Sequence, residues 1–331
     1  MARIIDFEAH VQPPEYVKEV EQYDGYPKYG NDSRGRFTWY VTPKIFEVRD
    51  RLRDKLADVK TRLGEMERAG IEMQVLTLTF PNCEAYPADL GIKLARMSND
   101  HIAQMIRQHP DHFTGLANLP LQDIEAALAE LDRVKGSGIR GINIFSNVRG
   151  KYVDAEEYWP IYERAQKLRF PIFLHPGVPV NAETYEKYHL WGPPFGFGAD
   201  ATAATLRLMM SGVFEEYPNL KIVLGHLGEG IPYFVKRIDW AYLRTPEEVP
   251  KLKRKPSEYF LNNFFLDTAG VFHEPSLQCA YETMGAEKIV FGSDYPMENA
   301  AQGVEFVADS RISKGDKEKI FWKNAADLLQ L

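Results

Sequence analysis

Eight short apolar runs, each separated from the next by a stretch with a helical pattern, constrain the fold of this chain more than any other feature. The runs lie at Ile4–Phe7, Met73–Thr79, Phe113–Ala117, Gly141–Phe145, Pro171–His175, Lys221–Gly225, Phe264–Thr268 and Lys288–Gly292. Several are uninterrupted, as in Ile222-Val223-Leu224, and do not alternate with polar residues. Such runs are typical of parallel strands that are covered on both faces. We therefore expect eight buried parallel strands.

The stretches between these runs have the periodicity of amphipathic helices. The expected helices span Leu56–Ala69, Asp89–Gln108, Asp123–Lys135, Glu156–Leu168, Ala201–Glu216, Ile231–Arg244 and Pro275–Met284. Gly70 follows the first helix and Gly136 the third, as is common at helix C-termini. No glycine-rich fingerprint of the dinucleotide or P-loop type follows any strand. The alternation predicts an α/β fold, a (β/α)8 TIM barrel, in one domain over residues 1–331.

Two long segments interrupt the alternation. Residues Val11–Arg53 form a long insertion after the first strand, and residues Gly177–Gly198 form a lid-like loop after the fifth. Both are rich in aromatic residues. Long loops in compact domains often carry function, and in a barrel both would emerge at the C-terminal rim, where such enzymes place their active sites.

Composition limits the classes of partner. The 331 residues are 44% hydrophobic and 26% charged, with a formal net charge of -7 and no block of like charge, which argues against nucleic acid or a membrane surface as partner. No run approaches the roughly 18 apolar residues that span a bilayer. The two cysteines, Cys83 and Cys279, lack metal-type or redox-type spacing. We expect a cytoplasmic protein with two buried thiols.

The polar residues at the ends of the predicted strands are of metal-ligand types. Glu8 and His10 follow the first strand, His175 the fifth, His226 the sixth and Asp294 the eighth. Residues at i and i+2 of an extended segment share a face, and the C-terminal ends of barrel strands meet at one mouth. Each residue alone has a plain structural explanation, an Asx turn for Asp294 or a core role for a histidine. Together they indicate a divalent cation site of the Zn or Mn type, with the oxygen ligands favouring Mn or Mg.

At these residues the chain resembles the amidohydrolase superfamily. It is most similar to the branch of metal-dependent decarboxylases that includes the aminocarboxymuconate semialdehyde, gamma-resorcylate and 5-carboxyvanillate enzymes. The resemblance covers nearly the whole chain. The matching motifs are Glu8-Ala9-His10, Arg62-Leu63 with Met66, Asn118-Leu119-Pro120, Leu174-His175-Pro176, Gly225-His226-Leu227-Gly228-Glu229, Arg237-Ile238-Asp239 and Asp294-Tyr295-Pro296 with Glu298-Asn299. The Glu-x-His form of the first motif is similar to the resorcylate type and departs from the muconate semialdehyde type.

The resemblance implies one metal ion, with Glu8, His10, His175 and Asp294 as its ligands. No lysine ends the fourth strand, where many amidohydrolases carry one that bridges two metals. By the same resemblance Asp294 is the proton carrier, and His226 with Glu229 lies just outside the ligands and orients it. A homodimer or homotetramer is also implied.

The expected substrate is a small carboxylic acid with a flat ring. Phe195 and Phe197, with Tyr295 and Met297, are candidates to sandwich a ring, although a lid or a subunit contact would use the same residues. Arg237 is a candidate for the substrate carboxylate, and a helix salt bridge to Asp239 or Glu229 is the alternative.

Three functions compete at this point. The first is non-oxidative decarboxylation of a hydroxylated aromatic or related unsaturated carboxylic acid, by a carbon-carbon lyase. The second is metal-dependent hydrolysis or hydration of a lactone or enol acid, in which His226 or Asp294 activates a metal-bound water. The third is a non-enzymatic binding protein on the same scaffold.

Overall fold

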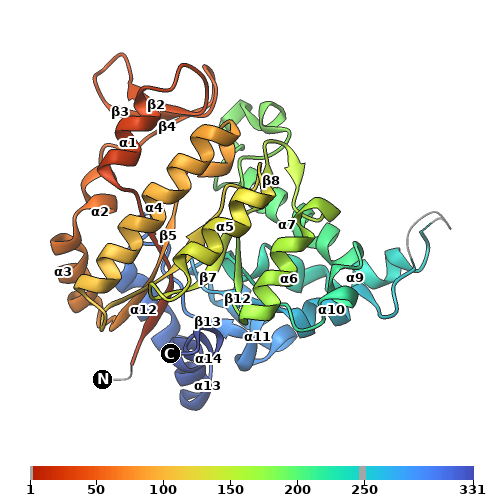
Figure 1. The fold of residues 1–331 in the computed structure, drawn as a ribbon. Helices are drawn as coiled ribbons and strands as arrows, with labels where there is room; N and C mark the ends of the chain where they lie inside the picture. The colour runs from red at the N-terminus through yellow and green to blue at the C-terminus, as the bar shows by residue number, and fades with distance from the viewer. Residues whose placement is uncertain (1–2, 246–250) are drawn as a thin grey trace.

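The computed structural model describes residues 3–245 and 251–331. Eight parallel strands, in the order β1-β5-β6-β7-β10-β11-β12-β13, form one sheet (Figure 1). Their bounds are β1 Ile5–Val11, β5 Met73–Leu78, β6 Phe113–Asn118, β7 Ile139–Phe145, β10 Ile172–His175, β11 Ile222–Leu224, β12 Phe264–Asp267 and β13 Ile289–Val290. Each predicted run overlaps one of these strands, so the eight-stranded prediction is confirmed.

The sheet closes on itself between its first and last strands. The Phe7 amide donates to the Phe291 carbonyl at 2.8 Å, and the His10 amide donates to the Tyr295 carbonyl at 2.6 Å. Ala9 and Tyr295 form a parallel bridge between the same two segments. The predicted (β/α)8 barrel is confirmed, and its first strand is longer than expected, since it runs to Val11 and contains Glu8 and His10.

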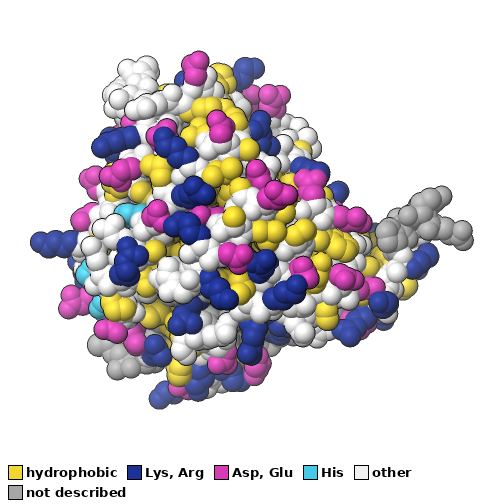
Figure 2. Space-filling model, in the orientation of Figure 1, with side chains coloured by type: hydrophobic (Ala, Val, Ile, Leu, Met, Phe, Trp, Pro, Cys, Tyr) yellow, Lys and Arg dark blue, Asp and Glu magenta, His cyan; other side chains and the backbone are white. Residues whose placement is uncertain are grey.

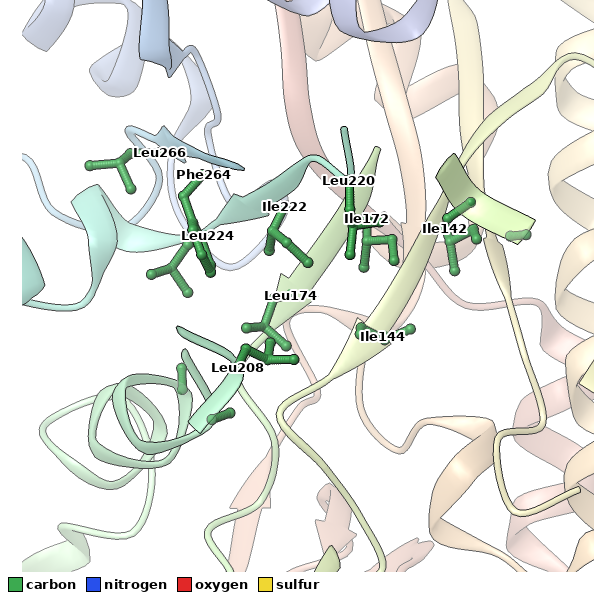
Figure 3. Close-up of a cluster of buried hydrophobic side chains, with 14 of the residues drawn as sticks. Ile142, Ile144, Ile172, Leu174, Leu208, Leu220, Ile222, Leu224, Phe264 and Leu266 are labelled. Atoms are coloured by element: carbon green, nitrogen blue, oxygen red, sulfur yellow. The ribbon is translucent and has the colours of Figure 1, made fainter. Parts of the chain in front are cut away.

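Helices cover the outside of the barrel. They are α2 Arg53–Ala57, α3 Val59–Ala69, α4 Ala88–Gln108, α5 Ile124–Val134, α6 Trp159–Leu168, α7 Gly196–Met210, α8 Val213–Glu216, α9 Ile231–Tyr242, α10 Pro256–Asn263, α11 Glu274–Met284, α12 Ala300–Asp309, α13 Lys314–Glu318 and α14 Asn324–Leu329. Strand side chains such as Ile142, Ile172 and Ile222 pack outward against this layer and are 0% exposed (Figure 3).

The inside of the barrel is filled by large apolar side chains. Phe7, Val75, Phe173 and Val223 belong to one buried cluster, which α14 joins through Leu329. Because these side chains fill the interior, a site can form only at the C-terminal ends of the strands.

The insertion and the lid-like loop lie at the same end of the barrel (Figure 1). The insertion contains helix α1 Pro14–Glu21 and an antiparallel sheet of β2 Lys28–Asn31, β3 Phe37–Tyr40 and β4 Phe46–Val48. Trp39 of this sheet contacts Trp191 of the loop edge to face, with ring centroids 5.8 Å apart. Buried aromatic contact therefore joins the two segments over the barrel mouth.

The surface and the cysteines complete the fold. On the face drawn in Figure 2, basic and acidic side chains are interspersed. None of the helices in the described ranges is long and apolar enough to cross a membrane. Cys83 is buried as expected, but Cys279 is half-buried, because Leu277 and Ala280 take the inner face of α11 and leave Cys279 at its side.

Candidate metal centre and cavity

Glu8 and His10 point into the barrel mouth from the middle of β1. The pairing of β1 with β5 shifts register between Asp6 and Ala9, where β1 carries one extra residue. Such a bulge re-aims side chains, and bulges are common beside active sites. His10 Nε2 lies 3.4 Å from Glu8 Oε1, and both side chains are almost completely buried. The predicted pairing of these two residues on one face is confirmed.

His175, the last residue of β10, faces the same point. Its Nε2 lies 3.6 Å from Glu8 Oε1, and its Nδ1 lies 2.8 Å from the Pro176 carbonyl. Since Nδ1–H donates to that carbonyl, the lone pair of Nε2 is free to bind a metal. Burial and the neighbouring His10 hold the pKa of His175 well below its usual value, which favours the neutral imidazole that metals require.

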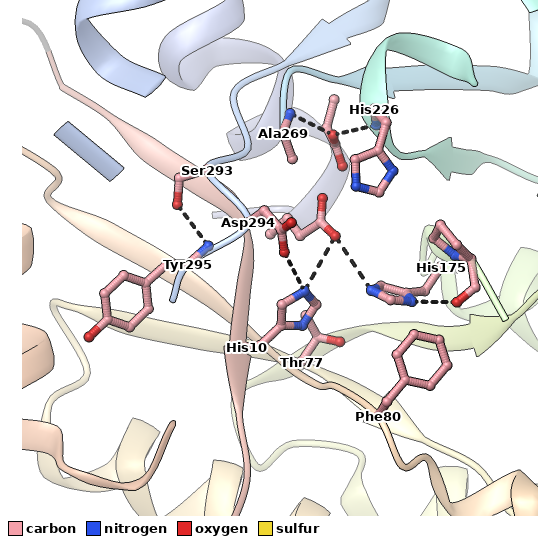
Figure 4. A network of polar contacts seen from close by, with 12 residues as sticks. His10, Thr77, Phe80, His175, His226, Ala269, Ser293, Asp294 and Tyr295 are labelled. Carbon is pink, nitrogen blue, oxygen red and sulfur yellow. Dashed lines mark hydrogen bonds and ion pairs between the residues drawn. The ribbon is translucent and has the colours of Figure 1, made fainter. Parts of the chain in front are cut away.

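Asp294 completes the predicted set. It follows β13 with a positive φ of 58°, and its Oδ1 lies 3.1 Å from His10 Nε2 (Figure 4). One potential ligand atom from each of Glu8, His10 and His175 lies within 4.8 Å of the other two. The structure thus brings all four residues predicted as ligands to one place, from two strands, β1 and β10, and the loop after β13.

The chemistry of this cluster fits a bound cation. Neither carboxylate oxygen of the buried Glu8 makes a hydrogen bond within the described part of the chain. Burial raises the pKa of Glu8 to about 8. A divalent cation would supply the missing counter-charge and hold Glu8 ionised, so the residues present suit the single metal ion that the family implies.

His226 and Glu229 lie beside the four candidate ligands. His226 Nδ1 contacts Glu229 Oε1 at 2.7 Å. Burial lowers the pKa of His226, but the carboxylates of Glu229, Glu8 and Asp294 together outweigh this effect and raise the pKa well above its usual value. Gly270 faces both His226 and Asp294, because a Cβ placed there would lie 3.3 Å from His226 Nε2 and 3.9 Å from Asp294 Oδ2. Glu229 therefore fixes the orientation of His226 beside Asp294, and a role of His226 in orienting Asp294 stays a prediction.

A buried polar network connects the segment that carries His10 with the segment that carries Asp294. Arg62 of α3 donates to the His10 carbonyl, and also to Gln74 Oε1 at 2.9 Å. Gln74 donates to Asp6 Oδ2 at 3.0 Å, and Asp6 accepts hydrogen bonds from the Ser293 amide and hydroxyl at 2.8 and 2.6 Å. This chain of contacts connects the backbone of His10 with the residue that precedes Asp294.

The cavity above the cluster has a volume of about 330 Å³, at the lower end of the range for small-molecule sites. Phe197 and Met297 line it, as predicted. Phe197 stacks on Phe80, with ring centroids 5.1 Å apart. One flat wall is therefore available for a ring.

Three predicted substrate-binding residues do not line this cavity in the single chain. Phe195 is 53% exposed and contacts Tyr185. The Tyr295 ring is buried under the Arg62 guanidinium, at 4.6 Å. Arg237 is exposed on α9, where its guanidinium lies 4.1 Å from the centre of the Trp240 ring. Their contacts with substrate stay predictions.

Three further residues are not predicted by the sequence reasoning. Asp267, at the end of β12, accepts hydrogen bonds from the His226 and Ala269 amides at 3.1 and 3.0 Å. The strand-end criterion that selects Asp294 would also have selected Asp267. Glu47 and Arg49 of the insertion line the cavity, and no periodic pattern in the insertion marks them.

Comparison with known proteins identifies the family of this chain. A family model described as amidohydrolase matches residues 5–331. A gamma-resorcylate decarboxylase from Polaromonas sp. (strain JS666 / ATCC BAA-500) is 40% identical over 299 residues, which cover 86% of this chain and 90% of that protein. A 5-carboxyvanillate decarboxylase structure from Sphingomonas paucimobilis has a TM-score of 0.91 and 30% identity, with 100% of both chains covered.

A second solved structure carries a metal. The dihydroxybenzoic acid decarboxylase from Polaromonas sp. JS666, with bound manganese and the inhibitor 2-nitroresorcinol, has a TM-score of 0.85 and 34% identity and covers 100% of this chain and 98% of that one. The family model spans nearly the whole chain, and these relatives match most of it. This chain therefore belongs to the amidohydrolase family, as its motifs predicted.

Proposed function

We propose that this protein is a metal-dependent, non-oxidative decarboxylase of a hydroxylated aromatic carboxylic acid. The observation that carries the proposal is the convergence of Glu8, His10 and His175, with Asp294 3.1 Å from His10, at the floor of a cavity that has an aromatic wall. Relatives named for the decarboxylation of such acids support it.

Glu8, His10, His175 and Asp294 would hold one divalent cation. When bound, the cation withdraws electron density from the carboxylate and phenolic oxygens of the substrate. We favour Mn over Zn, because two of the four side chains offer oxygen and because a relative was solved with bound manganese. The dimer or tetramer expected from the sequence stays a prediction.

The remaining chemistry belongs to the side chains. Asp294 delivers a proton to the ring carbon that bears the carboxylate, and a C–H bond forms there. The bond from this carbon to the carboxylate then breaks, its electron pair returns to the ring, and CO2 leaves. His226, held by Glu229 at 2.7 Å, orients Asp294 during this transfer. Phe197 and Phe80 hold the ring and exclude water.

A reconstitution experiment tests this function. Metal-free protein is loaded with Mn or Zn, and CO2 release is measured on a panel of hydroxybenzoates, with lactones and enol acids as a second panel. We expect CO2 from at least one hydroxybenzoate, no turnover by Asp294→Asn, and an unchanged circular dichroism spectrum of that variant. Turnover of lactones or enol acids alone would instead identify a hydrolase or hydratase, and near-normal activity of Asp294→Asn would remove Asp294 from the mechanism.

A further inference from the structure

The wall of the cavity that the insertion supplies is an ion pair. Arg49, directly after β4, has a side chain that is only 3% exposed, whereas the side chain of Glu47 is 36% exposed. Arg49 Nη2 and Nε donate to Glu47 Oε2 at 2.9 and 3.3 Å. Both residues line the same cavity as His10, His175 and Asp294.

Arg49 is held in one position by further contacts. Its Nη1 donates to the Phe80 carbonyl at 2.6 Å, and its guanidinium lies 4.5 Å from the centre of the Trp39 ring. The Phe80 ring in turn lies 5.4 Å from the His175 ring, beside the metal cluster (Figure 4). A guanidinium has five N–H groups, and three of them are used in these hydrogen bonds. Tyr29 also interacts with the guanidinium, so Arg49 is a fixed donor with its charge already paired.

The charges around the cavity leave no free cation for a second substrate carboxylate. Arg49 is the only arginine or lysine among the described residues that line it. Of the carboxylates that line it, Asp294 contacts His10, Glu229 is paired with His226 and Glu47 with Arg49, while Glu298 forms no ion pair within the described ranges. An acid group placed near Arg49 would meet the negative charge of Glu47, and Glu298 lines the same cavity.

A ring hydroxyl matches this wall better than a carboxylate does. Glu47 is an acceptor and Arg49 a donor, so the pair offers both partners that a hydroxyl uses. A carboxylate has no proton to donate to Glu47, and like charges brought together in a partly buried site repel strongly.

We propose that Glu47 determines substrate specificity. By occupying Arg49, it selects aromatic monocarboxylic acids that carry an additional ring hydroxyl, and it excludes acids with a second ring carboxylate. This role rests on the proposed function, because it concerns the substrate of the same site.

The test compares two acids that differ in this one group, 2,6-dihydroxybenzoate and 3-hydroxybenzene-1,2-dicarboxylate. For the Mn-loaded protein we measure kcat/KM for decarboxylation of each acid, and separately the Kd of each by calorimetry. The variant is Glu47→Gln, in which an amide oxygen still accepts from Arg49 but the charge is removed. The control is Glu163→Gln, which removes one negative charge from an exposed pair with Lys167, and neither residue belongs to the cavity lining.

We expect Glu47→Gln to raise the preference for the dicarboxylate over the dihydroxy acid at least tenfold, in kcat/KM and in Kd, and Glu163→Gln to leave both ratios unchanged. A ratio that moves less than twofold in Glu47→Gln, or a wild-type preference for the dicarboxylate, would overturn the role of Glu47. If wild type releases CO2 from neither acid, the proposed decarboxylation fails for both, while the ratio of Kd values still decides the role of Glu47. If Glu47 had only a structural role, Glu47→Gln would weaken the binding and turnover of both acids equally and leave both ratios unchanged.

Discussion

Replacement of Arg62 by methionine should destabilise the fold and loosen the metal site together. Arg62 is 1% exposed and donates to the His10 carbonyl and to Gln74, and its guanidinium lies on the Tyr295 ring. Burial lowers the pKa of Arg62 to about 10, so the side chain is still protonated at neutral pH. Methionine fills similar space but leaves two buried acceptors without a donor.

The magnitude follows from these lost contacts. Each buried acceptor left unpaired costs about 1–3 kcal/mol, and a desolvated cation–π contact contributes about 2 kcal/mol. Apolar packing of methionine and the removal of a buried charge offset part of this loss. We expect the free energy of unfolding to fall by about 3–5 kcal/mol, and metal affinity to fall about 10–100-fold, as for other residues that orient metal ligands.

Urea denaturation of the metal-free protein and metal titration measure the two effects separately. Arg68→Met is the matched control, because Arg68 lies on the same helix with its side chain 70% exposed, and it should change stability by less than about 0.5 kcal/mol. If Arg62→Met unfolds within about 1 kcal/mol of wild type and binds metal normally, the buried network does not hold the site, since two unpaired acceptors should exceed that value.

Three further changes have defined outcomes. Burial raises the pKa of Glu84 to about 7 from 4.5, so the folded state holds this proton more tightly than the unfolded chain does. The resulting gain in the free energy of unfolding is on the order of 3 kcal/mol. It is fully present below pH 4.5 and is lost as the pH rises through 7. Glu84→Gln should therefore flatten the unfolding free energy between about pH 5 and pH 8, and an unchanged slope in urea denaturation would contradict this. Gly270→Ala should lower kcat about 100-fold, because the new Cβ would lie 2.7 Å from His226 Cδ2. Gly212→Ala is the control, since Gly212 also has a positive φ, of 88°, and a Cβ there would have no atom within 4 Å. Equal kcat values in the two variants would refute the steric explanation. His10→Ala should lower metal affinity by more than the roughly 10–100-fold loss that is typical when a residue supporting a ligand is replaced. If elemental analysis finds one metal ion per chain in the purified variant, His10 is not a ligand.

The barrel and the metal cluster could be predicted because both follow from strand position. A run such as Ile222-Val223-Leu224 indicates a strand buried on both faces, and the ends of parallel strands must converge once the sheet closes. His10 and Asp294 are separated by 284 positions in the sequence, yet their side chains lie 3.1 Å apart. Residue type near the end of a strand therefore indicated the cluster, and the family resemblance separated the four candidate ligands from His226.

The cavity walls could not be predicted in the same way. Glu47 and Arg49 lie in an irregular insertion whose small sheet packs through aromatic contacts such as Trp39 on Phe80, at 4.9 Å, and no period of two or 3.6 residues encodes such contacts. Side-chain direction was the other difficulty. Tyr295 is adjacent to Asp294 in sequence, but its ring turns to Arg62 and away from the cavity.

Metal chemistry and substrate choice are supported by different parts of the molecule. Glu8, His10 and His175 lie on strands whose neighbours are fixed by barrel hydrogen bonds. Glu47 and Arg49 belong to a three-stranded sheet outside the barrel, and the Phe80 carbonyl connects Arg49 to the barrel. Within the described ranges, the hydrogen bonds and ion pairs of Glu47 and Arg49 do not include the side chains of the candidate ligands, so this pair can change while the ligands keep their geometry. Substitutions of Glu47 should therefore alter which acid is accepted and leave metal affinity intact. Substitutions in the network that supports β1, such as Arg62→Met, should lower metal affinity and leave the preference between acids unchanged.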